Sequence, residues 1–303
     1  MNYKKLFKVA AGSSAATLFY ANAIERRNFA LRFDKVKILE PGAKPITVLH
    51  IADLHMMPNQ LWKETWVGSL AKYQPDFIVN TGDSLSSPKA IPAIKRALSP
   101  FAGIPGVFVA GSNDYIAPTF RNPAKYLFAP SNQHKTKDIK PPKLDMPYME
   151  LGQTFERFGW TNIINGKENF DILGSYLKFS GVNDPHMELD EFQGFLNEEV
   201  PGVKIGVIHA PYIRVLDEFT EAGSQLIFAG HTHGGQLRIP FYGAIVANCD
   251  IPLEKSRGLH TWESGVNTSY INVSAGLGNS PYFPFRFACR PEASLITLLP
   301  KDA

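Results

Sequence analysis

The sequence predicts an α/β fold, because short strand-like runs alternate with segments of helical periodicity. Apolar runs that end in polar clusters recur at residues 46–53, 76–83, 106–114, 204–211 and 225–233. Between them, apolar residues follow helical spacing at 61–70, 91–98 and 213–219. Runs that are apolar on both faces are typical of buried strands, and strand followed by helix is the repeating unit of an α/β sheet.

The C-terminal third differs in character, with strand-like runs at 270–278 and 293–300 and few helical stretches between them. We expect a second, more antiparallel sheet there.

The 303 residues fit one large domain. With 31 Lys and Arg against 28 Asp and Glu, the basic field of a long nucleic-acid binder is missing. The two cysteines, Cys249 and Cys289, are expected to be unpaired thiols, although one disulfide is the alternative.

We expect residues 1–27 to form a signal-like or membrane-anchor segment. Lys4, Lys5 and Lys8 precede an uncharged stretch at 9–24, about 24 Å long as a helix, which is short of the roughly 30 Å hydrocarbon core. The basic start and the small residues Ala21-Asn22-Ala23 resemble a secretory signal. We therefore expect an exported protein or one held at the cell membrane. The alternative is an amphipathic helix packed on the domain of a cytoplasmic protein.

An insertion at 118–152 interrupts the main domain, which we place at 44–300. The insertion holds six prolines and five lysines and has little apolar periodicity. It predicts a long surface loop. Two interpretations are open: a lid that brings positive charge over a phosphate, or a solvated loop.

Polar clusters at the predicted strand ends supply carboxylate, imidazole and amide groups. They are Asp53, His55, Asp83, Asn113, His209, His231 and His233. Carboxyl ends of parallel strands converge on one crevice, and these groups are ligands for Mn²⁺, Fe²⁺ and Zn²⁺. An aspartate directly after an apolar strand is costly to bury without a nearby cation. The acidic and imidazole groups exceed the needs of one ion, so we expect two divalent metal ions that share Asp83.

The motifs D-x-H, G-D, G-S-N-D, a single His and G-H-x-H together resemble the calcineurin-like metallophosphoesterases. Residues 230–240 and 273–278 resemble the YkuE-type bacterial subgroup of that family. The resemblance covers about 44–299. It implies a four-layer α/β/β/α sandwich of two mixed sheets, with a two-metal site at one edge. It also implies hydrolysis of phosphomonoesters or phosphodiesters by a metal-activated water.

The resemblance assigns roles position by position. Asp53, His55, Asp83 and His233 would hold one ion, and Asp83, His209 and His231 the other. Asp83, Asn113 and His209 are the predicted catalytic residues. Small Gly234 would leave room for a phosphate, which Gln236 and Arg238 would contact.

The third motif departs from the family pattern, in which an asparagine ligand is followed by a histidine acid. Ser112 stands at the ligand position and Asn113 at the acid position. Because a serine hydroxyl is a weak ligand, we expect Asn113 to turn toward the second ion and Ser112 to lie near the substrate. The usual general acid is absent. His186 is the candidate replacement, and a solvated loop histidine is the alternative.

Three functions are compatible with these residues. The leading hypothesis is a phosphoesterase of the cell envelope that acts on a lipid-linked or nucleotide-sugar-lipid substrate and associates with the membrane through its N-terminal segment. The second is a binding or scaffold protein with a weakened catalytic site. The third is a soluble phosphodiesterase for cyclic nucleotides or nucleic-acid ends. No sequence feature indicates an oligomeric state.

Overall fold

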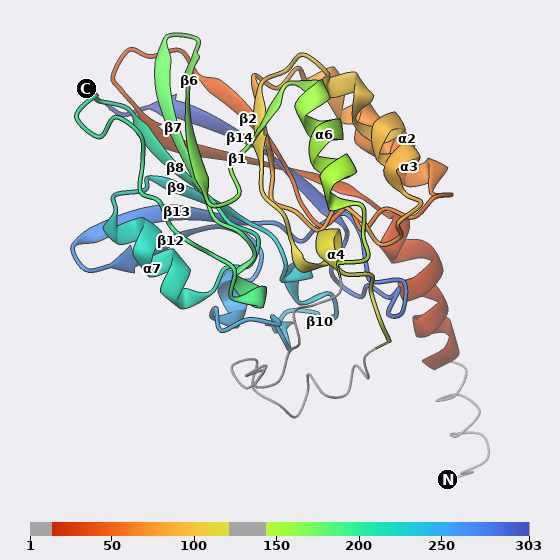
Figure 1. Ribbon diagram of the computed structural model, residues 1–303. Helices are drawn as coiled ribbons and strands as arrows, with labels where there is room; N and C mark the ends of the chain where they lie inside the picture. The colour runs from red at the N-terminus through yellow and green to blue at the C-terminus, as the bar shows by residue number, and fades with distance from the viewer. Residues whose placement is uncertain (1–13, 121–143, 303) are drawn as a thin grey trace.

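The computed structural model describes residues 14–120 and 144–302, and two six-stranded mixed sheets form its centre (Figure 1). The first sheet has the strand order β1 (Ala30–Leu39), β14 (Glu292–Pro300), β2 (Ile46–Ile51), β3 (Phe77–Asn80), β4 (Gly106–Phe108) and β5 (Trp160–Asn162). Its neighbouring strands are parallel, except for the antiparallel pair β14 and β2.

The second sheet has the strand order β12 (Gly258–Ser264), β13 (Asn267–Val273), β9 (Leu226–Ala229), β8 (Val203–Val207), β7 (Ser175–Gly181) and β6 (Gly166–Ile172). The four central strands are parallel, and the two edge strands pair antiparallel with their neighbours. A small hairpin of β10 (Arg238–Ile239) and β11 (Gly243–Ala244) lies outside both sheets.

Helices cover the outer face of each sheet (Figure 1). On the first sheet they are α2 (Leu61–Ser69), α3 (Ile91–Leu98) and α6 (Tyr148–Phe158), and on the second sheet α7 (Ile213–Glu221). The short helical elements are η1 (Tyr20–Ile24), η2 (Glu25–Arg27), η3 (Leu70–Tyr73), η4 (Ser99–Phe101), α4 (Ser112–Tyr115), η6 (Pro185–Met187), η7 (His233–Gly235) and η8 (Leu253–Lys255).

The apolar runs are continuous because each sheet is buried on both faces. In β2, Val48 packs between the two sheets, whereas its neighbour Leu49 packs under the helices. In β9, Phe228 faces the first sheet and Ile227 faces α7. Successive strand side chains point to opposite faces. The layers are therefore α/β/β/α, which confirms the predicted fold class.

Two expectations about the sheets need correction. The C-terminal third does not build its own sheet, because β13 extends the second sheet parallel to β9 and β14 inserts into the first. The domain also begins before residue 44, since β1 pairs with β14 along its whole length. Charged residues such as Arg32, Asp34 and Lys37 interrupt the apolar pattern of this edge strand and conceal it in the sequence.

The insertion and the N-terminal segment are described only in part. Residues 121–143 and 1–13 lie outside the described residues. Within the predicted loop, Tyr148 instead begins helix α6, and Leu151 is buried in the core beneath it. Residues 14–19 are helical and continue into η1. No helix among the described residues is long and apolar enough to cross a membrane. Cys249 and Cys289 are both buried and are not joined in a disulfide, as expected.

Candidate metal centre

The candidate ligands follow five parallel strands that end on the same side of the two sheets, the side where α4 lies in Figure 1. Asp53 and His55 come after β2, Asp83 after β3 and Asn113 after β4. From the second sheet, His209 comes after β8, and His231 and His233 come after β9. The structure brings these side chains together although they are up to 180 positions apart in the sequence.

Asp83 occupies the middle of the cluster. Its Oδ2 lies 3.5 Å from His55 Nε2 and 3.6 Å from His209 Nε2. His55 comes from the first sheet and His209 from the second. One carboxylate oxygen is thus placed between two imidazole nitrogens, as sharing by two ions requires.

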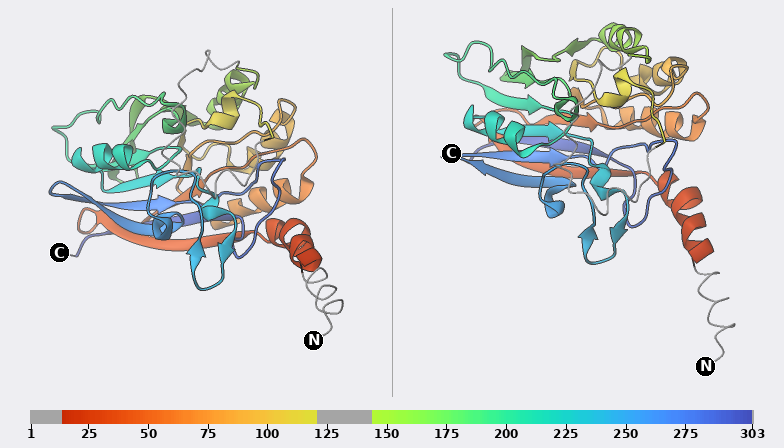
Figure 2. Two further views of the ribbon diagram at one scale, coloured as in Figure 1. Left: turned by 90° about the horizontal axis from the view of Figure 1, so that it is seen from below. Right: turned by 60° about the horizontal axis from the view of Figure 1, so that its bottom comes forward.

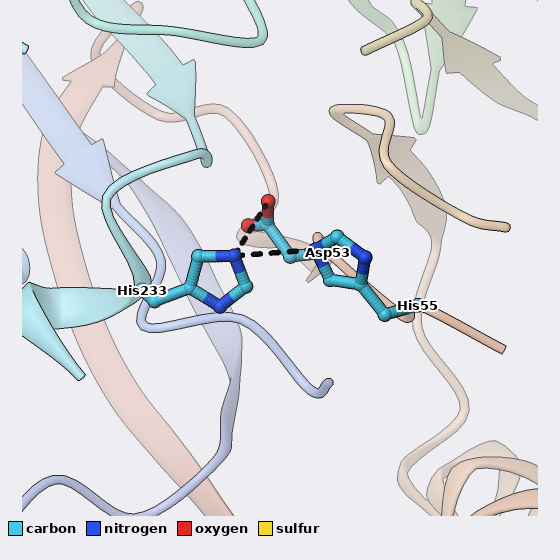
Figure 3. A group of neighbouring side chains, drawn as sticks. All are labelled: Asp53, His55 and His233. Carbon is cyan, nitrogen blue, oxygen red and sulfur yellow. Dashed lines mark hydrogen bonds and ion pairs between the residues drawn. The ribbon is translucent and has the colours of Figure 1, made fainter. Parts of the chain in front are cut away.

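The other carboxylate, Asp53, lies on the side of His55 and His233 (Figure 3). His233 Nε2 is 3.2 Å from His55 Nε2 and 3.8 Å from Asp53 Oδ1. One ligand atom from each of these three residues lies within 4.8 Å of the others. The same holds for Asp53, Asp83 and His209. Among the described residues, two overlapping ligand groups therefore share Asp53.

His231, from the second sheet, faces the cluster with Nδ1 and not with Nε2. Its Nδ1 lies 3.3 Å from His209 Nε2, whereas its Nε2 lies 3.2 Å from the carbonyl oxygen of Asn248. The backbone N–H of His231 also donates to both oxygens of Asp53, at 3.1 and 3.0 Å. His231 thus orients one candidate ligand through its backbone and presents another through its ring.

Hydrogen bonds behind the cluster fix the rings. His209 Nδ1 lies 2.7 Å from Thr81 O, and because a carbonyl only accepts, Nδ1 carries the proton and Nε2 faces Asp83. His55 Nδ1 lies 2.9 Å from Ser86 Oγ, and His233 Nδ1 lies 3.2 Å from Gly278 O. Such outer partners orient the coordinating nitrogen of metal-binding histidines.

The backbone of the cluster is strained. Asp53, His55, Asp83, His231 and His233 all have positive φ, between 41° and 67°. This conformation is uncommon outside glycine and costs about 1–3 kcal/mol per residue. This backbone conformation accompanies the convergence of the first and third side chains of the D-L-H and H-T-H motifs, and strain of this kind is typical of functional sites.

Glycines surround the cluster where a side chain would collide with it. A Cβ on Gly111 would lie 2.3 Å from Asp83 Oδ1 and 2.6 Å from His209 Nε2. A Cβ on Gly230 or Gly276 would lie 2.7 Å from Asp53. The close approach of backbone and ligands leaves these positions to glycine.

Electrostatics favour a cation inside the cluster. Burial raises the pKa of Asp53 to about 7, a shift that the charge of His209 opposes and that of Asp83 increases. Burial also opposes ionisation of Asp83, but the charges of His209 and His55 and the N–H of Asn113 outweigh it, so that the pKa of Asp83 falls well below its usual range. Burial likewise disfavours the charged form of His209, but the carboxylates of Asp83, Asp184 and Asp53 hold its pKa well above its usual range.

The remaining imidazoles are poised in the neutral form. Burial lowers the pKa of His55 to about 4 and takes the pKa values of His231 and His233 well below the usual range. Neutral imidazole is the form that binds metals. Two buried carboxylates and these unprotonated rings form a donor set that fits divalent ions such as Mn²⁺, Fe²⁺ and Zn²⁺.

The turn after β4 contributes to the cluster through Asn113. Its backbone N–H donates to Asp83 Oδ1 at 2.8 Å, and its side-chain amide donates to Asp83 Oδ2 at 2.6 Å. Asn113 therefore points toward the carboxylate shared between His55 and His209. Ser112, the first residue of α4, is partly exposed beside it. Buried Asp114 accepts from Ser84 N at 2.8 Å and ties the turn to the loop after β3.

The three residues predicted to contact phosphate have structural partners within the folded chain. Gly234 is buried, and a Cβ there would lie 3.0 Å from Cys289 Sγ, so close packing disfavours a larger residue at this position. Gln236 uses its amide to donate to the carbonyls of Phe283 and Phe285, at 2.8 and 2.9 Å. Arg238 donates to Gly234 O at 2.8 Å.

His186 lies next to the cluster, as its predicted role requires. Its ring centroid is 4.7 Å from that of His231, and its Nδ1 lies 2.8 Å from the hydroxyl of Tyr212. Asp184 caps the short helix η6 by accepting from the backbone N–H of His186 at 2.8 Å. The ring is therefore held in one position and is not a freely solvated loop side chain.

Sequence reasoning missed several residues that support the cluster. Arg286 is fully buried, and its Nη2 lies 3.3 Å from His233 Nδ1 and donates to Gly278 O at 2.7 Å. Lys63 is buried beneath the D-L-H turn, where its Nζ donates to Leu54 O at 2.6 Å, and burial lowers its pKa to about 7. The position of Arg286 inside the aromatic run at 282–287 was an available signal, whereas nothing in the sequence marks Lys63 as buried.

An α/β/β/α sandwich with aspartate and histidine groups of this kind at its strand ends is typical of the binuclear metallophosphoesterases, which are phosphoester hydrolases. The family model of calcineurin-like phosphoesterases matches residues 46–235. The chain belongs to this family, as the motifs predict, and a phosphoester is the substrate that the family implies.

Three relatives match most of the chain. The uncharacterized protein YpbG of Bacillus subtilis (strain 168) is 26% identical over 301 residues, which cover 96% of this chain and 94% of the relative. The uncharacterized metallophosphoesterase YkuE of the same organism is 23% identical, with coverage of 87% and 82%. The phosphodiesterase YaeI of Escherichia coli (strain K12) is 23% identical, with 92% of both chains covered.

Among solved structures, TT1561 of Thermus thermophilus aligns with a TM-score of 0.43 and 12% identity, covering 77% of this chain and 91% of that one.

Proposed function

We propose that the chain hydrolyses a phosphomonoester or phosphodiester at the cell membrane, using a water activated by two divalent ions. The observation that carries this proposal is the position of Asp83 Oδ2, 3.5 Å from His55 Nε2 and 3.6 Å from His209 Nε2. A carboxylate oxygen between two imidazoles from different sheets is suited to neighbouring ions. The cytoplasm is the alternative location.

In this proposal, Asp53, His55, Asp83 and His233 would hold one ion, and Asp83, His209 and His231 the other. Ions bound there would lower the pKa of a nucleophilic water and would neutralise charge on the phosphoryl oxygens. The carbonyl of Thr81 keeps His209 in the tautomer that presents Nε2, and the hydroxyl of Ser86 orients the ring of His55. His186 is placed to give a proton to the leaving group.

For the substrate, we favour a lipid-linked phosphodiester, including a nucleotide-sugar lipid. One relative, YaeI, is named a phosphodiesterase. The described part of the N-terminal helix also exposes Leu18 and Phe19, at 58% and 66%, as expected for a segment near a membrane. We also place the chain in the YkuE-type subgroup, on the G-H-T-H-G-G-Q run and the match to YkuE.

The hydrolytic proposal is tested with the purified full chain loaded with Mn²⁺. Bis-p-nitrophenyl phosphate and p-nitrophenyl phosphate serve as diester and monoester, and elemental analysis counts ions per chain. We expect two ions, and an Asp83→Asn variant that is at least about 100-fold slower. Asp302→Asn is the matched control, because this carboxylate is exposed and pairs with Lys37. Equal turnover by Asp83→Asn and the parent would refute the proposed centre.

A binding or scaffold role is the second candidate, and the turn after β4 favours it. Asn113 stands at the acid position of the family motif and uses its amide on Asp83. Two ions per chain without turnover of either ester would favour this role over hydrolysis.

A further inference from the structure

Two separate elements project exposed apolar side chains into solvent. On the N-terminal helix they are Leu18, Phe19, Tyr20 and Ile24, and on the β10–β11 hairpin they are Ile239, Phe241 and Tyr242. We call these seven residues the docking surface. Phe241 is fully exposed and Tyr242 is 78% exposed, at the tip of the hairpin. Large exposed apolar groups gathered in this way mark interaction sites.

The helix and the hairpin leave the molecule on the same side, as both views of Figure 2 show. A groove of about 430 Å³ lies between them and is lined by Tyr20 from the helix, Pro240 from the hairpin and Phe287 from the C-terminal part of the chain. The two projections therefore form one face.

Residues 284–288 hold the two projections in a fixed relation. On the helix side, the backbone N–H of Arg286 donates to Ala21 O at 3.1 Å, and Tyr20 packs edge-on against Phe287. On the hairpin side, the backbone N–H of Arg238 donates to Phe287 O at 2.9 Å. Because the helix and the hairpin are both attached to the same segment, they keep their relative position when they contact a partner.

The base of this face is basic. Exposed Arg290 lines the groove and donates to the carbonyls of Asn28 and Phe29. Arg257 also lines the groove and is paired with Glu292. The acidic residue of the groove, Glu25, is buried, and its carboxylate accepts from the backbone N–H of Cys289 at 2.6 Å.

We propose that the docking surface binds a lipid bilayer with anionic headgroups. Aromatic and aliphatic side chains at two tips, with arginines behind them, match the two layers of a membrane surface, in which acyl chains lie below charged headgroups. This inference rests on the proposed membrane location and adds the hairpin as a second contact. It is independent of the hydrolytic chemistry.

The docking surface lies next to the metal centre. Arg286, whose backbone is bonded to the N-terminal helix, reaches His233 Nδ1 with its Nη2 at 3.3 Å. Cys289 Sγ lies 3.3 Å from His233 O. A single segment thus separates a bilayer held at this face from one of the predicted metal ligands.

The test is sedimentation of the full chain with vesicles of phosphatidylglycerol and phosphatidylcholine, compared with phosphatidylcholine alone. We expect binding to the anionic vesicles. The double variant Phe241→Ser/Tyr242→Ser should bind them about tenfold more weakly, because two side chains no longer enter the apolar layer. Val266→Ser is the control, since Val266 is fully exposed at the tip of the β12–β13 hairpin, away from β10 in Figure 1. Thermal unfolding and metal content check that the variants fold.

Each contrary outcome has a distinct meaning. If the full chain binds neither kind of vesicle, the docking surface and the proposed membrane location are both wrong. This conclusion holds whether or not the chain hydrolyses a soluble ester. If the double variant binds as the parent does, the hairpin inference alone is overturned. Equal binding to neutral vesicles contradicts the role of the arginines. If the parent forms a dimer that the double variant does not form, and both bind vesicles equally, the hairpin is a contact between copies of the chain and not a membrane contact.

Discussion

The side-chain amide of Asn113 lies 2.6 Å from Asp83 Oδ2, the oxygen that faces both His55 and His209. A second bond, from the backbone N–H of Asn113 to Asp83 Oδ1, is 2.8 Å long. The turn after β4 therefore controls the central carboxylate, even though the motif there departs from the family pattern.

Asn113→Ala should lower metal occupancy below two ions per chain and slow hydrolysis by about 10–100-fold, the usual effect of losing a group that orients a ligand. The backbone bond to Asp83 remains in this variant, so the loss should be partial. Elemental analysis after exhaustive dialysis gives the ion count. Ser112→Ala is the companion variant: if it loses the ion while Asn113→Ala keeps both, the serine is the ligand and our assignment is wrong.

Gly111→Ala should displace the ligands without a cost to the backbone. The φ of Gly111 is −112° and its ψ is 172°, which any residue adopts, but a Cβ would lie 2.3 Å from Asp83 Oδ1. We expect a loss of the ion on the His209 side and a fall in activity of at least about 100-fold. Gly152→Ala is the control, because a Cβ in helix α6 would meet Phe108 only at 3.9 Å. Full metal content in Gly111→Ala would contradict the observed geometry.

The sequence predicted the strands and helices whose pattern of apolar residues follows their buried faces. The β2 and β9 runs are apolar because both faces are buried, and helices α2, α3 and α7 lie where the apolar spacing placed them. Edge strands such as β1 and β6 carry charged side chains toward solvent and give no such pattern. Helix α6 was missed because its first turn lies at the end of a proline-rich insertion.

The candidate ligands could be chosen from the sequence because carboxylates and imidazoles at strand ends are chemically unusual. Their supporting partners could not. His209 is oriented by the carbonyl of Thr81, and His231 by the carbonyl of Asn248; any residue type supplies a carbonyl. Gln236 and Arg238 follow the last motif and suggested phosphate contacts, but their side chains bond to backbone carbonyls in the folded chain.

His186→Ala should affect esters with poor leaving groups selectively. The ring lies 4.7 Å from His231 and is held by the Tyr212 hydroxyl, so it is placed to donate a proton to a departing alkoxide. We expect hydrolysis of phenyl phosphate to fall by about 10²-fold, and that of p-nitrophenyl phosphate to change little, because nitrophenolate leaves without a proton. His260→Ala in β12 is the control. Equal losses on both esters would show that His186 supports the site and is not the acid.

Glu292→Gln should destabilise the fold in a pH-dependent way. Glu292 is 2% exposed at the start of β14, where Arg32 donates to it at 2.9 and 3.1 Å and Arg257 forms a second ion pair. Burial opposes its ionisation, but the hydrogen bonds from Arg257 and Arg32 outweigh burial and lower its pKa. A lowered folded pKa means that the stabilisation is complete above the unfolded pKa of about 4.3 and disappears as the pH falls through the folded value.

At pH 7, Glu292→Gln should therefore cost about 2 kcal/mol of unfolding free energy, which is less than for a fully buried pair because Arg32 is one-third exposed. The difference from the parent should narrow when the pH is lowered below about 4. Urea unfolding with EDTA present, followed by tryptophan fluorescence at pH 7 and pH 3.5, measures both values. Glu254→Gln, at an exposed site, should have no effect at either pH. A constant difference between parent and Glu292→Gln across the two pH values would show that side-chain shape, and not charge, explains the effect.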